Sequence, residues 1–459
     1  GYNVANSLRF NDGSSDSLDR TVSSTPTNAD KCTISCWIKR SSLAEGVILG
    51  NYSSANFRAK FGFDSNHKLE YFQVNDGSAS CSVTTDMLFR DTSAWYHVVC
   101  AVDTTDGTAS NRIKIYVNGT QVDVTFGTNI AQNLDFKLNQ ASVPLDVGQD
   151  GNNQKYFDGY MAEFVLIDGQ QLDQTSFGEF DEDSPTIWKP KDVSGLTFGD
   201  DGFHLDFENA SSLGADVSGN SNNFTVNNLT SIDQSTDTCT NNFCTMNPLS
   251  NLYNGSYTYE HGNLEVQSNV RRGSFSTFGV ASGKWYCEAK LISFSNGGSG
   301  TNLYGVGVSA DTFNGDNSGV GGPTNSVAYV GTGVKEVANS ASSYGNTYTT
   351  NDIIGIALDL DNNNIYFSKN GTFQNSGDPT SGSTGTGAIS ITAARSTPDG
   401  VYFFNSGHIE NIAKWNFNFG APSFSISSGN ADANGHGNFE YAVPSGYFAL
   451  CTKNLAENG

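Results

Sequence analysis

The sequence is poor in charge, and above all in positive charge. Charged residues make up 15% of the 459 residues, and Lys plus Arg number 24 against 47 for Asp plus Glu, a formal net charge of −23. The basic residues are scattered and form no stripe. Because phosphate backbones are bound mainly through clustered lysines and arginines, we expect no nucleic acid among the partners.

Long apolar runs are missing as well. Ile353 to Leu358 is among the longest apolar stretches, and it falls far short of the roughly 20 residues of a membrane helix. The beginning of the chain shows no basic segment followed by an apolar one, as a signal peptide would. We therefore expect neither membrane insertion nor an export signal.

Apolar residues show no helical period and no heptads, which excludes an internal coiled-coil stalk. The chain holds instead 50 Gly, 30 Phe and 19 Tyr beside three Met. Aromatic side chains suit a pleated surface, and glycine allows tight turns. Alternation predicts a strand at Lys31 to Arg40 and a hairpin at Phe57 to Phe72, and Asn118-Gly119 predicts a two-residue turn.

Residues 177–250 differ in composition from the residues before them. They hold Pro185, Pro190 and Pro248 among clusters of Asn, Ser and Gly. Brief strand patterns occur at Phe203 to Phe207 and at Phe224 to Val226. We interpret this range as a connector that contributes strands to a second sandwich.

The cysteines fit no zinc pattern. Cys32 and Cys36 would stand about 13 Å apart on one strand, too far to bridge. We expect mostly reduced core thiols and assembly in a reducing cytoplasm. Cys239 and Cys244, in a loop-like stretch, are the pair that could bridge locally.

Several separated motifs of the first 176 residues occur in the order of one family. They are Leu8-Arg9-Phe10-Asn11-Asp12-Gly13, Ser35-Cys36-Trp37-Ile38-Lys39-Arg40, Trp95-Tyr96-His97-Val98-Val99, Ile115-Tyr116-Val117-Asn118-Gly119 and Asp158-Gly159-Tyr160-Met161-Ala162-Glu163. This part resembles laminin G-like, concanavalin A-like lectin domains. The resemblance implies a jelly-roll sandwich that binds ligands at rim loops or on its concave face.

A second set of motifs lies between about 255 and 424. They are Gly283-Lys284-Trp285-Tyr286-Cys287-Glu288, Tyr304-Gly305-Val306-Gly307-Val308-Ser309, Tyr344-Gly345, Asn351-Asp352-Ile353-Ile354-Gly355-Ile356-Ala357-Leu358-Asp359, Tyr366-Phe367-Ser368-Lys369-Asn370-Gly371 and Asn416-Phe417-Asn418-Phe419-Gly420. This range resembles a SPRY domain. This resemblance implies a second sandwich whose loops recognise partners and which has no chemistry of its own. The order of both domains, with Gly202 to Phe207 and Asp216 to Phe224 between them, is similar to virion proteins of marine tailed bacteriophages.

One acidic run is the main enzymatic candidate. On a strand, Glu179, Asp181 and Asp183 would share a face, as the paired carboxylates of lectin-like glucanases do. The third of these positions, Asp183, has a shorter side chain than the glutamate of the glucanases. The run also lies between Gly178 and Pro185 at the end of a domain. We interpret it as a solvated loop and assign no catalytic residues.

Two loops offer oxygens for calcium. Asp359, Asp361 and Asn363 imitate a calcium loop but lack its glycine and its last glutamate, so a hairpin turn explains them. The better candidate is the connector loop with Asp216, Asn220 and Asn222 or Asn223, for which the alternative is an Asx-type turn. A structural calcium ion is the one cofactor considered.

The remaining candidates are aromatic, His and Asn residues. We expect His97, Trp37, Trp95 and Trp285 to lie in the sandwich cores. Outward-facing tyrosines could stack on sugars, but the ligand-binding residues stay open. Asn118 and Asn254 would be glycosylated only on a eukaryotic secretory route.

The sequence thus predicts an all-β chain of two antiparallel β-sandwiches in tandem. The expected ranges are 1–176 for the lectin-like domain, 177–250 for the connector, 251–425 for the SPRY-like domain and 426–459 for a C-terminal extension. We expect a non-enzymatic virion-surface adhesion protein, a tail fibre or capsid decoration, that is assembled in the host cytoplasm. Its partners would be a host glycan or envelope protein, other virion proteins and copies of itself, with a trimer as the first guess. The alternatives are a polysaccharide-cleaving enzyme and a secreted cell-surface adhesin, and the latter predicts disulfides.

Overall fold

The computed structural model describes residues 1–250, 257–268, 273–295, 304–312, 320–408 and 412–459. They form two compact units, Gly1–Thr240 and Asn241–Gly459. Antiparallel sheets dominate each unit, which confirms the all-β prediction. Among the described residues, no helix is both long and apolar enough to cross a membrane.

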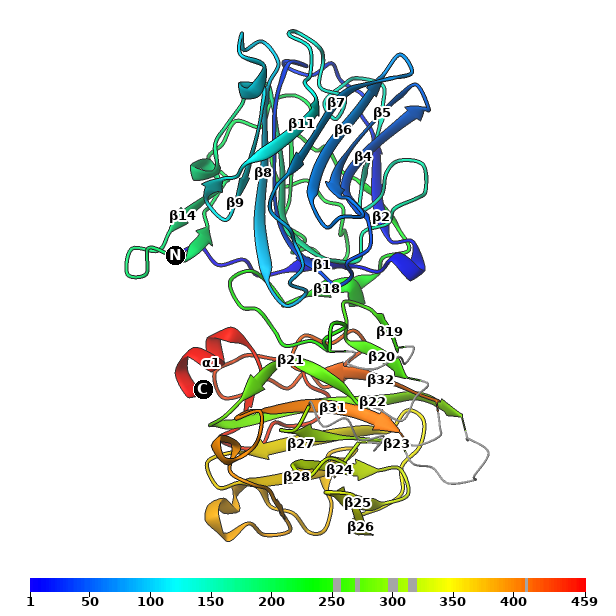
Figure 1. The fold of residues 1–459 in the computed structure, drawn as a ribbon, viewed down its shortest axis with the longest axis vertical. Coiled ribbons are helices and arrows are strands. Elements are labelled where there is room, and N and C mark those ends of the chain that lie inside the picture. Colours follow the sequence, from blue (N-terminus) through cyan, green and yellow to red (C-terminus); the bar gives the residue numbers. More distant parts are fainter. Residues whose placement is uncertain (251–256, 269–272, 296–303, 313–319, 409–411) are drawn as a thin grey trace. The chain divides into compact units, whose positions relative to one another are not determined.

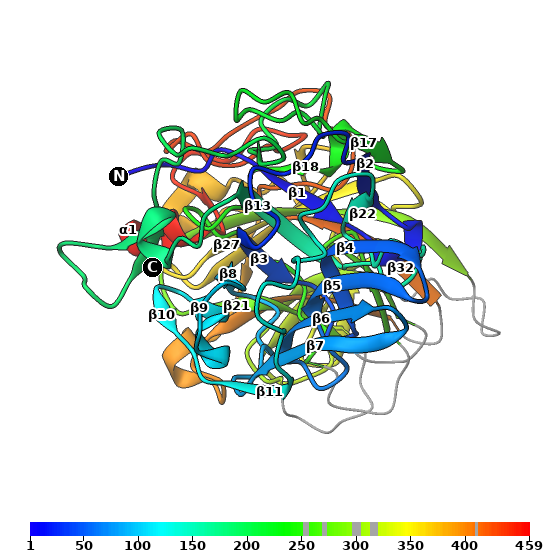
Figure 2. The ribbon, with the colours of Figure 1, turned by 90° about the horizontal axis from the view of Figure 1, so that it is seen from above.

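The first unit is a sandwich of two sheets (Figure 1). The back sheet has the order β10-β9-β8-β3-β13-β1-β18, with β16 paired to β13, and the front sheet has the order β11-β7-β6-β5-β4-β12-β2-β17. Figure 2 shows β4 to β7 of the front sheet in a row. The strands are β1 Ser7–Phe10, β2 Ser17–Thr21, β3 Lys31–Arg40, β4 Gly46–Ser54, β5 Phe57–Phe63, β6 Leu69–Asn75, β7 Ser78–Thr85, β8 Trp95–Asp103, β9 Ile113–Val117, β10 Thr120–Gln121, β11 Val124–Thr128, β12 Pro144–Val147, β13 Gly159–Asp168, β16 Phe203–Leu205, β17 Thr225–Asn227 and β18 Gln234–Ser235. A small hairpin, β14 Gly178–Phe180 with β15 Trp188–Pro190, lies outside both sheets.

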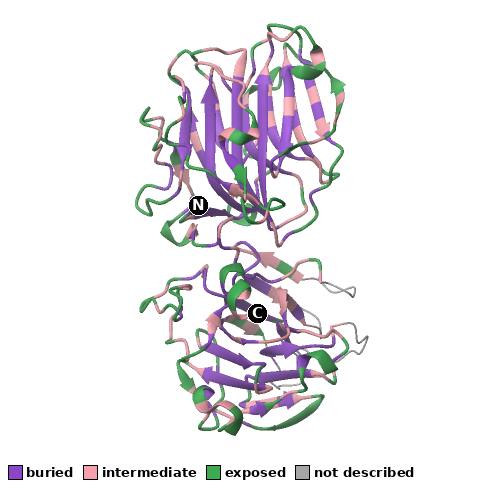
Figure 3. Cartoon of the chain, turned by 90° about the vertical axis from the view of Figure 1, so that its left-hand side faces the viewer, coloured by how far each residue is buried: buried purple, intermediate pink, exposed green. Residues whose placement is uncertain are grey.

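Strand β3 shows how the sequence builds this core. Ile34 and Ile38 point between the sheets, as the period of two requires. Trp37 points to the opposite face, where it packs with Trp95 and Tyr160. Both faces of the strand are therefore buried, which explains why its apolar residues depart from strict alternation. Figure 3 shows buried residues along the strands of both units.

The strands of the predicted connector join the first unit, which corrects the expectation that they join the second. β16 pairs with β13, β17 with β2 and β18 with β1. The end of the 177–250 range lies in the second unit, where Phe243 and Met246 bridge to Cys451 and Ser276.

Ion pairs and a buried hydrogen bond give the physical reason. Asp237 lies 2.8 Å from the Lys39 ammonium and Asp233 lies 3.5 Å from Arg9. His204 Nε2 and Glu163 Oε2 are hydrogen-bonded at 2.9 Å. A buried charge is costly unless it is paired, so these contacts fix the connector on the first unit.

The second unit holds two further sheets. One has the order β19-β20-β32-β22-β27-β28-β29, with β30 on β28 and β33 on β22, and the other has the order β21-β31-β23-β24-β25-β26. The strands are β19 Tyr257–Glu260, β20 Glu265–Ser268, β21 Ser274–Val280, β22 Lys284–Ser295, β23 Tyr304–Ser309, β24 Ser326–Val330, β25 Val334–Val337, β26 Ser340–Ser343, β27 Ile353–Asp359, β28 Asn364–Lys369, β29 Thr372–Phe373, β30 Ile389–Ser390, β31 Tyr402–His408, β32 Ile412–Asn418 and β33 Phe448–Ala449. Single 3-10 turns in the two units are η1 Asp12–Ser14, η2 Ala109–Asn111, η3 Gln174–Ser176, η4 Ser231–Asp233, η5 Pro379–Thr384 and η6 Ala394–Ser396.

Residues 426–459, the predicted extension, pack onto the β22 sheet. β33 runs parallel to β22, and Phe439 and Tyr447 form a buried cluster with Tyr286. The chain ends in helix α1 (Thr452–Asn458), which the sequence did not predict. Its seven residues are too few to display a helical period.

Candidate functional site

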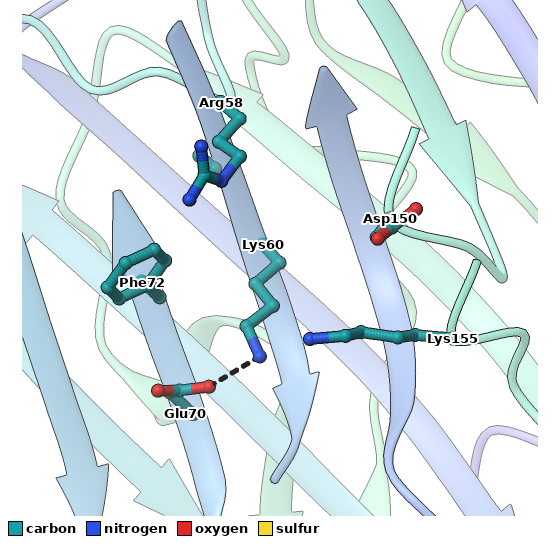
Figure 4. A pocket seen from close by; sticks show the side chains of 7 residues that line it. Arg58, Lys60, Glu70, Phe72, Asp150 and Lys155 are labelled. Carbon is teal, nitrogen blue, oxygen red and sulfur yellow. Dashed lines mark ion pairs between the residues drawn. The ribbon is translucent and has the colours of Figure 1, made fainter. Parts of the chain in front are cut away.

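A cavity of about 270 Å³ opens on the outer face of the front sheet. It combines cationic, anionic and aromatic side chains from two strands and one loop. Its lining residues are Arg58, Ala59, Lys60, Glu70, Phe72, Asp150 and Lys155 (Figure 4).

Strand register places the first part of this site. In β5 and β6, Phe61 and Tyr71 face the core, so their neighbours Lys60 and Phe72 face outward. Lys60 pairs with Phe72 on one side and with Gly50 of β4 on the other. The hairpin predicted at Phe57 to Phe72 is confirmed and positions these side chains.

A loop that crosses β4 places the second part. Gly50 makes the crossing possible, because a Cβ there would lie 2.3 Å from the Gln149 carbonyl oxygen. Asp150 stabilises the loop by accepting the peptide N–H groups of Asn152 and Gln154. Lys155 is anchored through its carbonyl, which accepts the Val47 N–H at 2.9 Å.

A chain of ion pairs holds the floor of the cavity. Lys60 Nζ lies 2.8 Å from Glu70 and 2.7 Å from Glu45, and Lys155 Nζ lies 2.8 Å from the same Glu45 oxygen. Burial acts against the charge on Glu45, but hydrogen bonds from Lys155 and Lys60 hold its pKa below the usual value. The network therefore keeps four charged side chains ordered before any ligand arrives.

The predicted calcium loop forms a hydrogen-bonded turn. Asp216 accepts the N–H groups of His204, Ser218 and Asn222 and the Ser218 hydroxyl. Asn223 Oδ1 accepts the Asp216 N–H at 2.9 Å, and Asn220 donates to the carbonyls of Gly199 and Gly202. The turn thus accounts for all three predicted ligands, and calcium here stays a prediction.

The acidic run is not a strand of alternating carboxylates. β14 ends at Phe180, and Asp181 begins a turn by accepting the N–H groups of Asp183 and Ser184. Lys189 lies 3.2 Å from Asp181 and 3.7 Å from Glu179. The hydrogen bond from Lys189 and those from the turn lower the pKa of Asp181. The geometry matches the predicted solvated loop.

The structure brings together a Ser–His pair that the sequence analysis missed. His97 Nε2 lies 2.8 Å from Ser35 Oγ, although 61 residues separate them along the chain. Trp188 donates its indole N–H to His97 Nδ1, so the ring proton is on Nε2 and points to Ser35. Burial lowers the pKa of His97 to about 3. His97 therefore has no free lone pair with which to take a proton from Ser35.

Trp37, Trp95, His97 and Trp285 are all buried, as predicted. Trp285 lies in a sandwich core, but Trp37, Trp95 and His97 lie on the opposite face of the back sheet, which corrects the prediction for these three. Asn118 and Gly119 both have positive φ in a two-residue turn between β9 and β10. Asp359 accepts the Asp361 and Asn362 N–H groups in the β27–β28 hairpin, as predicted. Asn254 lies outside the described residues.

All eight cysteines are free thiols: Cys32, Cys36, Cys81, Cys100, Cys239, Cys244, Cys287 and Cys451. Cys239 is half-buried and the others are buried. The structure thus leaves Cys239 and Cys244 unbridged.

Two protein families match the chain, and each match lies within one of the two units. Residues 12–174 match the concanavalin A-like lectin/glucanases superfamily in its Laminin_G_3 model. Residues 284–393 match the SPRY domain. A concanavalin A-like domain is followed by a SPRY domain.

Three solved structures are similar to parts of the chain at low identity. A SAP-like pentraxin from Limulus polyphemus is 16% identical, with a TM-score of 0.29, over 38% of this chain and 80% of that chain. The SPRY domain of human HERC1 is 14% identical, with a TM-score of 0.28, over 38% and 96%. A putative carbohydrate-binding protein from Bacteroides ovatus is 15% identical, with a TM-score of 0.35, over 49% and 59%.

The cavity lies entirely within the matched range of the concanavalin A-like domain. In the unit that holds the SPRY domain, and among the described residues, Glu260, His261 and Glu265 bring three potential metal ligands together. Lys414 Nζ lies 2.8 Å from Glu265 and 3.6 Å from Glu260. The same ammonium group thus already pairs with both carboxylates.

Proposed function

We propose that this chain is a non-enzymatic carbohydrate-binding protein and that the front-sheet cavity is its sugar site. The observation that carries the proposal is the row formed by Lys60 and Phe72 beside Asp150. A half-buried aromatic ring can pack on the apolar face of a pyranose. Charged donors and acceptors around it can bind the hydroxyl groups.

The size and order of the cavity suit this role. Its volume of about 270 Å³ lies just below the roughly 300–1,000 Å³ of pockets for drug-sized ligands, so one or two sugar units fit. The ion pairs of Lys60 and Lys155 order the donors in advance, which lowers the entropic cost of binding. The match to a superfamily that includes lectins supports the same reading.

The rival function is cleavage of a polysaccharide, because that superfamily also includes glucanases. The acidic run is tied to Lys189 in a turn, and Ser35 faces the protonated nitrogen of His97. These two geometries support binding without catalysis.

We propose the virion surface as the place of action, as a tail fibre or capsid decoration assembled in the host cytoplasm. The support is the resemblance of the domain order and connector to phage virion proteins. The partner would be a host glycan or envelope protein, and other virion proteins would hold the chain. Repeated copies, with a trimer tested first, would multiply weak single-site affinity.

Binding to an immobilised glycan array, followed by calorimetry on the hits, tests the sugar site. We expect Phe72→Ala to weaken binding about 5- to 150-fold, taking as a guide the roughly 1–3 kcal/mol that stacking of a base on an aromatic side chain contributes. Phe57→Ala is the matched control, since Phe57 is 40% exposed on the neighbouring strand β5 but does not line the cavity. Equal loss in both variants, or release of shortened glycan by the wild type, contradicts the proposal.

Antibody labelling of purified particles tests the location. Label on intact particles supports the virion proposal. Label confined to host medium or cell walls overturns that proposal and leaves the sugar-site proposal unaffected.

A further inference from the structure

Arg58 is the one cation of the cavity that no carboxylate of the described residues pairs with. Lys60 and Lys155 are neutralised by Glu45 and Glu70. Arg58 Nη1 instead donates to the neutral carbonyl of Ala55. The guanidinium has five N–H donors in a fixed fork, so most of them are available to a ligand.

Arg58 and Asp150 line different sides of the same cavity. Arg58 is on β5, two residues before Lys60, and points into the open space that Phe72 borders (Figure 4). Asp150 is on the loop that crosses β4, on the other side of Lys60 from Phe72. The site thus presents an anion-binding group, a ring face and a hydroxyl acceptor.

A neutral sugar would satisfy only part of this set. Its hydroxyls could donate to Asp150 and its ring could lie on Phe72, but Arg58 would lose water without gaining an anion. Covering a charge without pairing it costs free energy. A carboxylate on the sugar would accept two charge-assisted N–H bonds from the guanidinium fork.

The net charge of −23 does not prevent such a ligand from binding. The Debye length is about 8 Å at physiological salt, so distant surface carboxylates are largely screened. Groups within the cavity decide the local potential, and there the lysines and glutamates form neutral pairs.

We infer that the cavity takes a uronic acid unit of an acidic polysaccharide, with Arg58 as the residue that binds the sugar carboxylate. This inference rests on the proposed function and adds the class of sugar to it. Phe72 binds the ring face, and Asp150 accepts hydroxyl protons.

Calorimetry on the full chain with paired ligands tests the inference. The probes are trigalacturonic acid, mannuronate and guluronate trimers, each beside its methyl ester, which keeps the hydroxyls and removes the charge. We expect at least one acid to bind about 10- to 100-fold more tightly than its ester, the range for a hydrogen bond to a charged group. Arg58→Gln should reduce acid binding to about the ester level and weaken ester binding much less than acid binding.

Two further variants separate charge from geometry. Arg58→Lys keeps the charge without the planar fork, so we expect intermediate affinity. Arg90→Gln removes the same charge at an exposed position that does not line the cavity, and should change nothing.

The outcomes distinguish the two proposals. Equal binding of acid and ester, unchanged by Arg58→Gln but lost in Phe72→Ala, overturns the uronic acid inference and keeps the sugar site. Full competition by inorganic phosphate at the same affinity also overturns it, because the site would then select a bare anion. Binding of sugars that neither Arg58→Gln nor Phe72→Ala alters overturns the site itself.

Discussion

Trp188 donates its indole Nε1–H to Nδ1 of His97 across 3.0 Å, from a hairpin outside both sheets of the first sandwich. The ring of Trp188 fits against two glycines. A Cβ on Gly119 would lie 2.2 Å from it, and one on Gly178 would lie 2.5 Å from it. The contact therefore fixes the hairpin on the back sheet and holds His97 in a single tautomer.

Trp188→Phe should destabilise the first unit by about 1–3 kcal/mol, because it leaves Nδ1 of a buried His without a donor. Urea unfolding with the remaining tryptophans as reporters measures this change. In the wild type, nitrogen NMR should show His97 neutral, with the proton on Nε2, from about pH 8 down to about pH 4. A His97 that titrates near its ordinary pKa contradicts the assignment.

The connector should depend on its buried ion pair. Lys39 and Asp237 are each 1% exposed, and Trp95 also donates to Asp237. Asp237→Ala should cost about 3–5 kcal/mol, because it removes the carboxylate that pairs with a buried ammonium. Glu179→Gln is the control, since it removes a largely exposed pair with Lys189 and should cost less than about 1 kcal/mol. Equal melting temperatures for both variants contradict this account.

A count of free thiols should distinguish assembly in a reducing cytoplasm from secretion, which would favour disulfides. The structure has eight free cysteines, so denatured, unreduced protein should react with eight equivalents of a thiol reagent. In the native protein Cys239 should react first, because it alone among the eight is not fully buried. Burial also raises the pKa of Cys239, so the reaction should be slow at neutral pH. Fewer than eight thiols would favour the secreted adhesin.

The sequence predicted the features that depend on neighbouring residues, such as turns and strand faces. The turn at Asn118-Gly119 was predictable because both residues tolerate the positive φ of that hairpin. The alternation also predicted the hairpin at Phe57 to Phe72, and its register puts Lys60 and Phe72 on the face opposite to the core residues Phe61 and Tyr71. The sequence analysis nevertheless left the ligand-binding residues open. The crossing of β4 by the Asp150 loop could not be predicted, because it depends on a close approach between Gly50 and Gln149, 99 residues apart along the chain.

The misplaced connector strands show the same limit. β16 and β17 have three residues each, so their own sequence specifies a strand but no partner. The pairing of β16 with β13 depends on contacts such as that of His204 with Glu163, which lie 41 positions apart in the sequence. Local propensity carries no information on such long-range pairs.

Glu288 should make the second unit less stable as the pH rises. Glu288 is fully buried on β22, and its carboxylate accepts the N–H groups of Glu440 and Tyr441. These two hydrogen bonds hold the segment around Glu440 against the sheet. Burial raises the pKa of Glu288 to about 7, although these hydrogen bonds oppose the rise. The native state therefore holds a proton that the unfolded state has already lost. The stabilisation is complete below the ordinary glutamate pKa and is lost as the pH rises through about 7.

The expected loss between about pH 4.5 and pH 7 is of the order of 3 kcal/mol. Hydrogen exchange measured by mass spectrometry, corrected for intrinsic rates, should show residues 436–445 becoming less protected above neutral pH. Glu288→Gln should remove this dependence. Asp146→Asn is the matched control, because burial raises the pKa of Asp146 to about 7 as well, but in the first unit. If the pH dependence of exchange in residues 436–445 survives Glu288→Gln, or disappears with Asp146→Asn, another group controls the stability of this segment.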